Sequence, residues 1–140
     1  MSAENVEIVR EIYRRYVLDP ESTFELLDPE IEWSEPPEVP DSQTSRGHEG
    51  VRRSLRKFVG TWENFHLEVV DLINAGDSVI ACTRLTGRGK GSGVEIDQDQ
   101  FAVWTLRKGK AVRLQMVFDR DEADRVAGLS DDKTAAGGKP

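Results

Sequence analysis

The sequence contains a single cysteine, Cys82, among its 140 residues. This scarcity excludes a disulfide within the chain and a zinc site built from several cysteines. The sequence also lacks an uninterrupted apolar run of about 18 residues, the length that a membrane-spanning helix requires. Its first residues contain neither a basic nor an apolar segment, so no signal peptide is predicted. Together, these absences predict a cytoplasmic protein that does not cross a membrane.

Positively charged residues are outnumbered in this chain. It has 19 lysines and arginines against 26 aspartates and glutamates, which gives a formal net charge of −7. Such a charge repels nucleic acid and anionic membranes, and a solvated helix face explains the one basic strip, over residues 46–57. The two histidines, His48 and His66, have no cysteines near them and form no metal-binding pattern. We therefore expect no nucleic-acid partner, no membrane partner, no metal and no cofactor.

What the sequence does contain is a change of hydrophobic period along the chain. Helical periodicity covers residues 4–17, 21–27, 47–59 and, more weakly, 121–129. Alternating or buried strand patterns cover residues 31–35, 66–74, 78–88, 94–106 and 111–118, and residues 36–46 read as a polar loop. This order predicts an α+β fold, with a strongly curved antiparallel sheet and helices packed on its concave face. We expect one domain over residues 1–129 and a disordered tail over 130–140.

Several stretches of the sequence resemble one family. They read LLDPEIEW over 26–33, RGHEGVR over 46–52, NAGD over 74–77 and VWTLRKGK over 103–110. In this order they resemble the SnoaL-like branch of the nuclear transport factor 2-like superfamily. That fold is a cone that encloses a pocket, and its members include ketosteroid isomerases, polyketide cyclases, epoxide hydrolases and non-catalytic binding domains.

The resemblance implies a small hydrophobic molecule as the partner and a homodimer as the assembly. It further implies general acid/base chemistry on a small apolar carbonyl or epoxide compound, of the isomerase, cyclase or hydrolase type. The alternative is a non-catalytic module of the same fold that binds a small molecule or dimerises, because fold alone does not determine function.

Glu35 is the strongest catalytic candidate. In the resembling isomerases, a carboxylate before a proline at this point removes a proton next to a carbonyl. Strand parity places Trp33 and Glu35 on the same face, so an inward Trp33 brings Glu35 with it. Contact with the indole is then expected to desolvate the carboxylate and raise its pKa. The alternative is a surface glutamate in an acidic loop.

Three further residues are candidates for acid/base or oxyanion roles. The resemblance implies that Tyr13 donates to a developing oxyanion, and Tyr16 on the same helix face could replace it. The alternative for Tyr13 is a core residue whose hydroxyl bonds a backbone carbonyl. Asp99 turns inward only if Phe101 does, and it could instead belong to a solvated strand end. Asp119 either joins a polar pocket or caps the last helix.

The expected ligand-binding residues are mostly aromatic. The set is Tyr16, Trp33, Trp62, Phe65, Arg84, Phe101, Met116 and Phe118. Arg84, inside an apolar strand, needs a carboxylate or a ligand oxyanion if it points inward, and an exposed position is the alternative. Phe101 and Trp104 have opposite parity on one strand, which favours a second subunit on one of its faces.

Overall fold

The computed structural model describes residues 2–39 and 42–129, so the expected tail over 130–140 lies outside it. The elements are α1 (Ser2–Leu18), η1 (Pro20–Leu26), β1 (Leu27–Ser34), β2 (Thr44–Arg46), α2 (Gly47–Thr61), β3 (Trp62–Ala75), β4 (Ser78–Gly89), β5 (Glu95–Arg107), β6 (Lys110–Val117) and α3 (Arg120–Ala127). The predicted order of helices and strands is confirmed. The short strand β2 was not predicted, because its three residues lie in the polar segment interpreted as a loop.

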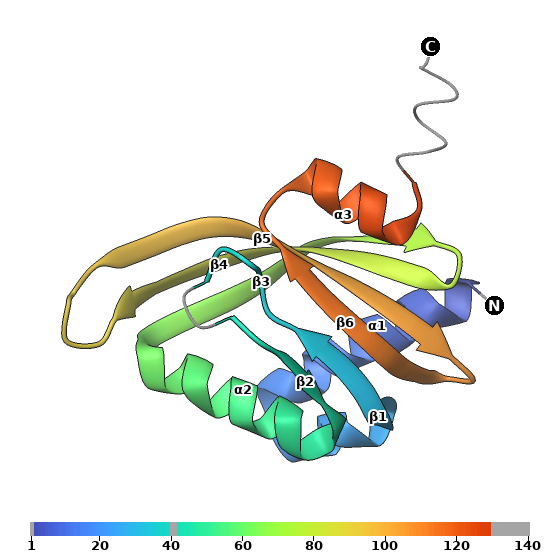
Figure 1. The fold of residues 1–140 in the computed structure, drawn as a ribbon, viewed down its shortest axis with the longest axis horizontal. Coiled ribbons are helices and arrows are strands. Elements are labelled where there is room, and N and C mark those ends of the chain that lie inside the picture. The colour runs from blue at the N-terminus through green and yellow to red at the C-terminus, as the bar shows by residue number, and fades with distance from the viewer. Residues whose placement is uncertain (1, 40–41, 130–140) are drawn as a thin grey trace, which may run out of the picture.

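The six strands form one sheet in the order β2-β1-β6-β5-β4-β3 (Figure 1). Strands β3 to β6 are joined in sequence as antiparallel hairpins, and two of their turns use Gly76 and Gly109 at φ values of 78° and 81°. Glycine adopts this left-handed backbone without a steric penalty. Strands β1 and β6 pair in parallel, so the sheet is mostly, not wholly, antiparallel. The α+β class is confirmed.

Helices cover both faces of the sheet (Figure 1). Helices α1 and α2 pack on one face, where Val9, Ile31, Val51 and Trp104 belong to the larger core. Helix α3 packs on the other face, over a smaller core to which Phe101 contributes. The expectation of helices on the concave face therefore describes α1 and α2 but not α3. Because α3 covers the second apolar face, that face is no longer an argument for a partner subunit. The homodimer stays a prediction.

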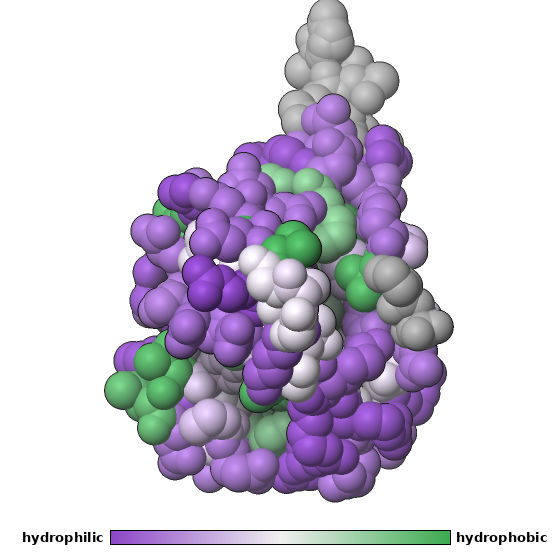
Figure 2. Space-filling view, turned by 90° about the vertical axis from the view of Figure 1, so that its left-hand side faces the viewer, coloured by the Kyte–Doolittle hydropathy of each residue, from purple (hydrophilic) through white to green (hydrophobic). Residues whose placement is uncertain are grey.

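The outer surface is mostly polar. Figure 2 shows an end of the molecule on which hydrophilic residues cover most of the area and hydrophobic residues form small, separate patches. Exposed ion pairs such as Arg14–Glu11 and Arg88–Glu95 contribute to this polar surface. Within residues 2–39 and 42–129, no helix has the length and apolar character needed to cross a membrane.

Candidate functional site

A cavity of about 700 Å³ lies between the inner face of the sheet and the helices α1 and α2. Its wall is largely apolar, with rings from both layers: Trp33, Phe58, Trp62, Phe65, Trp104 and Phe118. Pockets of this size and character are typical of small-molecule sites. Among the described residues, no group of histidine, cysteine and acidic side chains is arranged to hold a metal ion.

Helix α2 supplies one wall of the cavity through its periodicity. Val51, Leu55 and Phe58 recur at the spacing that places side chains on one helix face, and all three line the cavity. Ser54 and Lys57 flank this stripe and also reach the wall. Two polar side chains of the helix thus lie beside the end of β1.

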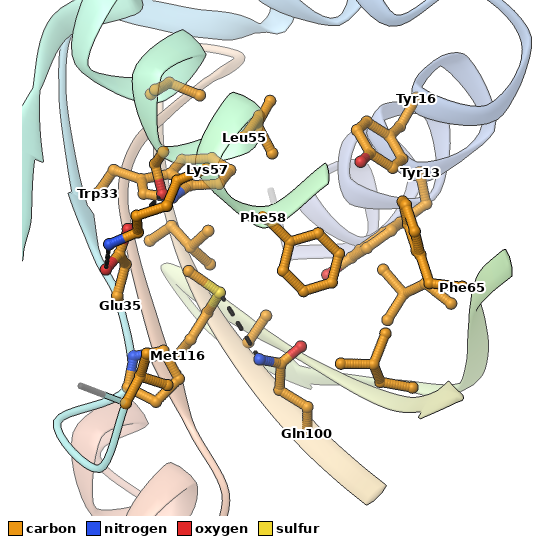
Figure 3. A pocket seen from close by; sticks show the side chains of 18 of the residues that line it. Tyr13, Tyr16, Trp33, Glu35, Leu55, Lys57, Phe58, Phe65, Gln100 and Met116 are labelled. Carbon is orange, nitrogen blue, oxygen red and sulfur yellow. Dashed lines mark hydrogen bonds and ion pairs between the residues drawn. The ribbon is translucent and has the colours of Figure 1, made fainter. Parts of the chain in front are cut away.

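The carboxylate of Glu35 lies in this wall, directly after β1, and its side chain is only 8% exposed. It accepts hydrogen bonds from Ser54 Oγ at 2.7 Å and Lys57 Nζ at 2.8 Å. The backbone N–H of Gln43 donates a longer third bond of 3.3 Å. Figure 3 shows Lys57 and Glu35 together on one side of the cavity, next to Trp33. Strand parity therefore correctly predicted that Trp33 and Glu35 share this wall.

The expected pKa of Glu35 is wrong in direction. Burial is the largest single influence and raises the pKa of this carboxyl. The hydrogen bonds from Lys57, Ser54 and the Gln43 backbone, together with the charge of Lys57, outweigh burial and hold the pKa below its ordinary value. The sequence interpretation counted only the desolvation by Trp33. An adjacent ammonium group favours the charged form, so Glu35 is ionised at neutral pH.

Tyr13 lies on the opposite side of the cavity, beside Tyr16 (Figure 3). Its hydroxyl oxygen accepts a hydrogen bond of 3.1 Å from the indole Nε1 of Trp104. Among the described residues, the backbone carbonyl of the alternative interpretation is not its partner. The rings of Trp104 and Trp33 meet edge to face, with centroids 6.0 Å apart. Because an indole N–H only donates, the Tyr13 proton stays available. Burial raises the pKa of Tyr13, which keeps this donor protonated.

The structure brings together eight of the twelve residues singled out in the sequence. Glu35 and Tyr13 line the cavity, as do Tyr16, Trp33, Trp62, Phe65, Met116 and Phe118.

The inward orientation of Asp99 and Phe101 is wrong. Trp104 faces the cavity, so residues of the opposite parity on β5 face away from it. Phe101 packs under α3 with the smaller core, and Asp99 is exposed on that same outer face.

Arg84 and Asp119 also lie outside the cavity wall. Arg84 is exposed on the outer face, where its guanidinium binds the Asp97 carboxylate through two bonds of 2.8 and 2.6 Å. The exposed alternative for Arg84 is therefore correct. Asp119 precedes α3, and its carboxylate accepts a hydrogen bond of 3.1 Å from the backbone N–H of Glu122. This is the helix-capping alternative.

Replacement of the Asp119 cap gives a first prediction. We expect Asp119→Ala to lower the free energy of unfolding by about 1 kcal/mol, because the cap of α3 is lost. Asp119→Ser should restore most of this stability, since serine also caps helices. Urea denaturation measures both variants. If Asp119→Ala leaves stability unchanged but abolishes ligand binding, the assignment of Asp119 as a cap is incorrect.

Sequence reasoning missed the residues that bond to Glu35 and Tyr13, namely Ser54, Lys57 and Trp104. Ser54 could have been found from its helical spacing with Val51 and Phe58. Lys57 was assigned to the solvated face of its helix, and no local pattern distinguishes it from its basic neighbours. Trp104 was recognised as a large aromatic residue, but its bond to Tyr13 spans 91 positions in the chain and has no local signal.

Comparisons with known proteins identify the family of this chain and its fold. The family model of the SnoaL-like domain matches residues 9–114, so the chain belongs to the SnoaL-like domain family. No curated protein matches the chain.

Solved structures of low sequence identity share the fold. An NTF2-like protein from Burkholderia thailandensis is 28% identical, with a TM-score of 0.75 over 89% of this chain and 95% of that one. An NTF2-like protein of unknown function from Burkholderia pseudomallei is 23% identical, with a TM-score of 0.75 over 91% and 98%. TerC, crystallised with polyporic acid, is 23% identical, with a TM-score of 0.73 over 89% and 98%. These likenesses place the chain in the nuclear transport factor 2-like fold, to which SnoaL-like proteins belong.

Proposed function

We propose that the cavity binds a small, largely apolar carbonyl or epoxide compound and that Glu35 acts on it as a general base. The observation that carries this proposal is the position of an ionised, nearly buried carboxylate in the wall of a largely apolar cavity. The co-crystallisation of TerC with polyporic acid supports a small organic molecule as the occupant of this fold.

The proposed reaction uses a base, Glu35, on one side of the cavity and a hydrogen-bond donor, Tyr13, on the other. Glu35 takes a proton from the carbon next to a carbonyl, and the C–H electron pair moves into a new double bond as the carbonyl oxygen becomes an enolate. The Tyr13 hydroxyl, held by Trp104, donates a hydrogen bond to that oxygen. Return of the proton to another carbon gives isomerisation, whereas attack of the enolate on a second carbonyl gives cyclisation. With an epoxide, the same carboxylate would activate water.

One observation favours the non-catalytic alternative. Lys57 and Ser54 hold the pKa of Glu35 below its ordinary value, and a carboxylate with a lowered pKa is a weaker base. In a binding module, the same three residues would form a polar anchor for a ligand hydroxyl or carbonyl. The two functions differ in whether a bound compound is turned over.

A substitution that fills the cavity with a larger side chain tests whether the cavity is the ligand site. We expect a thermal-shift screen of polyketide-like, steroid-like and terpenoid carbonyl and epoxide compounds to give binders of the wild-type protein. Leu55→Trp should abolish those shifts, because Leu55 lines the cavity and the larger ring occupies it. Val59→Trp, one turn later on the exposed side of α2, should bind like the wild type. Undiminished binding by a folded Leu55→Trp variant would rule out this cavity as the site.

A further inference from the structure

The inner face of β5 carries two amide side chains, Gln98 and Gln100, in the cavity wall. They alternate with outward-facing residues, and Ala102 and Trp104 continue the same inner face towards the core. Opposite Gln98 on β4 lies Leu85, which also lines the cavity. The two amides are therefore adjacent to each other on one strand and set in apolar surroundings.

These amides lack strong hydrogen-bond partners among the described residues. The nitrogen Nε2 of Gln100 reaches only the thioether sulfur of Met116, at 4.0 Å, and a thioether is a weak acceptor (Figure 3). The Gln98 side chain makes no hydrogen bond to any residue within 2–39 and 42–129. By contrast, the backbone carbonyl of Gln100 is bonded by Thr83 Oγ1 at 2.8 Å. The strand is thus held in place while its two side-chain amides remain available.

An available amide in an apolar wall discriminates between ligands. An apolar ligand would displace water from both side chains and leave their donors and acceptors unpaired, which costs free energy. A ligand that places a carbonyl or hydroxyl group there would replace those hydrogen bonds. A site built to bond such a group rejects an analogue that lacks it.

We infer that Gln98 and Gln100 form a second polar subsite. This subsite selects ligands that carry a carbonyl or hydroxyl group remote from the carbonyl or epoxide on which Glu35 acts. The two polar positions lie two strands apart in the order β1-β6-β5, which corresponds to about 10 Å across a sheet. The register adds a displacement along β5, because Val103 is level with Ser34 through Gln115, and Gln100 and Gln98 lie three and five residues from Val103. The ligand class is therefore a ring compound with oxygen functions near both ends. This inference rests on the cavity being the ligand site, as proposed above.

A pair of probes that differ in one hydroxyl group tests the subsite: anthrone and 2-hydroxyanthrone. Titration followed by tryptophan fluorescence should show that the wild-type protein binds the hydroxylated probe about three- to tenfold more tightly. In the double variant Gln98→Met/Gln100→Met, this preference should disappear while the affinity for anthrone is kept. Methionine retains the length of the side chain and removes the amide.

Gln115→Met is the matched control, because Gln115 lies on the neighbouring strand β6 and does not line the cavity. It should keep the wild-type preference. A preference that survives in the double variant overturns this inference and leaves the proposed function intact. If the wild-type protein binds neither probe while other compounds of the thermal-shift screen bind in the cavity, this inference is overturned and the proposed function stands. Binding with the expected preference but without any dependence of turnover on Glu35 supports the subsite and contradicts the catalytic proposal.

Discussion

Glu35→Gln is expected to lower the turnover of a bound carbonyl compound by about 10²–10⁴-fold, the usual contribution of a positioned general base. The glutamine can still accept a hydrogen bond from Ser54, but it cannot take a proton. Ligand affinity should change much less, because apolar side chains form most of the cavity wall. Exchange of the substrate C–H for deuterium in D₂O, followed by mass spectrometry, measures the proton-transfer step directly.

Glu38 provides the matched control for this experiment. It is exposed at the same cavity, on the loop after Glu35, and it makes no bond to the residues that bind the Glu35 carboxylate. Glu38→Gln should exchange deuterium at the wild-type rate. If Glu35→Gln also retains full exchange with a compound that binds in the cavity, the general-base assignment fails and the binding function remains.

Lys57→Met is expected to move the acid limb of the pH–rate profile to higher pH, because the ammonium group that favours the ionised form of Glu35 is removed. The base must be ionised to act, so activity falls as the pH drops through the pKa of Glu35. In the wild-type protein, burial raises this pKa, but the hydrogen bonds and positive charge around the carboxylate, chiefly from Lys57, outweigh burial. Removal of the ammonium group leaves the desolvation less opposed, and the pKa of Glu35 must rise. The limb of kcat/KM reports the pKa in the free protein.

The pH at which the acid limb of the profile falls is the decisive measurement, because it does not depend on the maximum rate, which Lys57→Met can also change. Arg56→Met, the neighbouring cation on α2, is exposed and does not line the cavity. It controls for the loss of one positive charge and should leave the limb in place. A limb that stays unchanged or moves down in Lys57→Met would show that another group titrates, and it would remove Glu35 from the base role.

The cavity side of β1 and α2 was predictable from the sequence because it depends on local periodicity. A strand alternates its side chains, so Trp33 and Glu35 had to share a face once one of them turned inward. The stripe formed by Val51, Leu55 and Phe58 likewise follows from 3.6 residues per turn.

Strand β5 shows where that reasoning failed. It carries a large aromatic residue on each face, Phe101 and Trp104, so alternation alone could not decide which face pointed inward. The packing of α3 on the outer face decided it, and it carried Asp99 outside with Phe101. The same choice brought Gln98 and Gln100, interpreted as part of a polar cluster, to the cavity.

By itself, the sequence determined the class of fold, the order of its elements apart from β2, and the shared face of Trp33 and Glu35. These follow from periods of two and 3.6 residues and from turn chemistry. Only the tertiary structure decided the electrostatics of the site. The partners of Glu35 and Tyr13 lie 22 and 91 positions away along the chain. Contacts over such separations are set by how helices pack on a twisted sheet, and no local pattern encodes them.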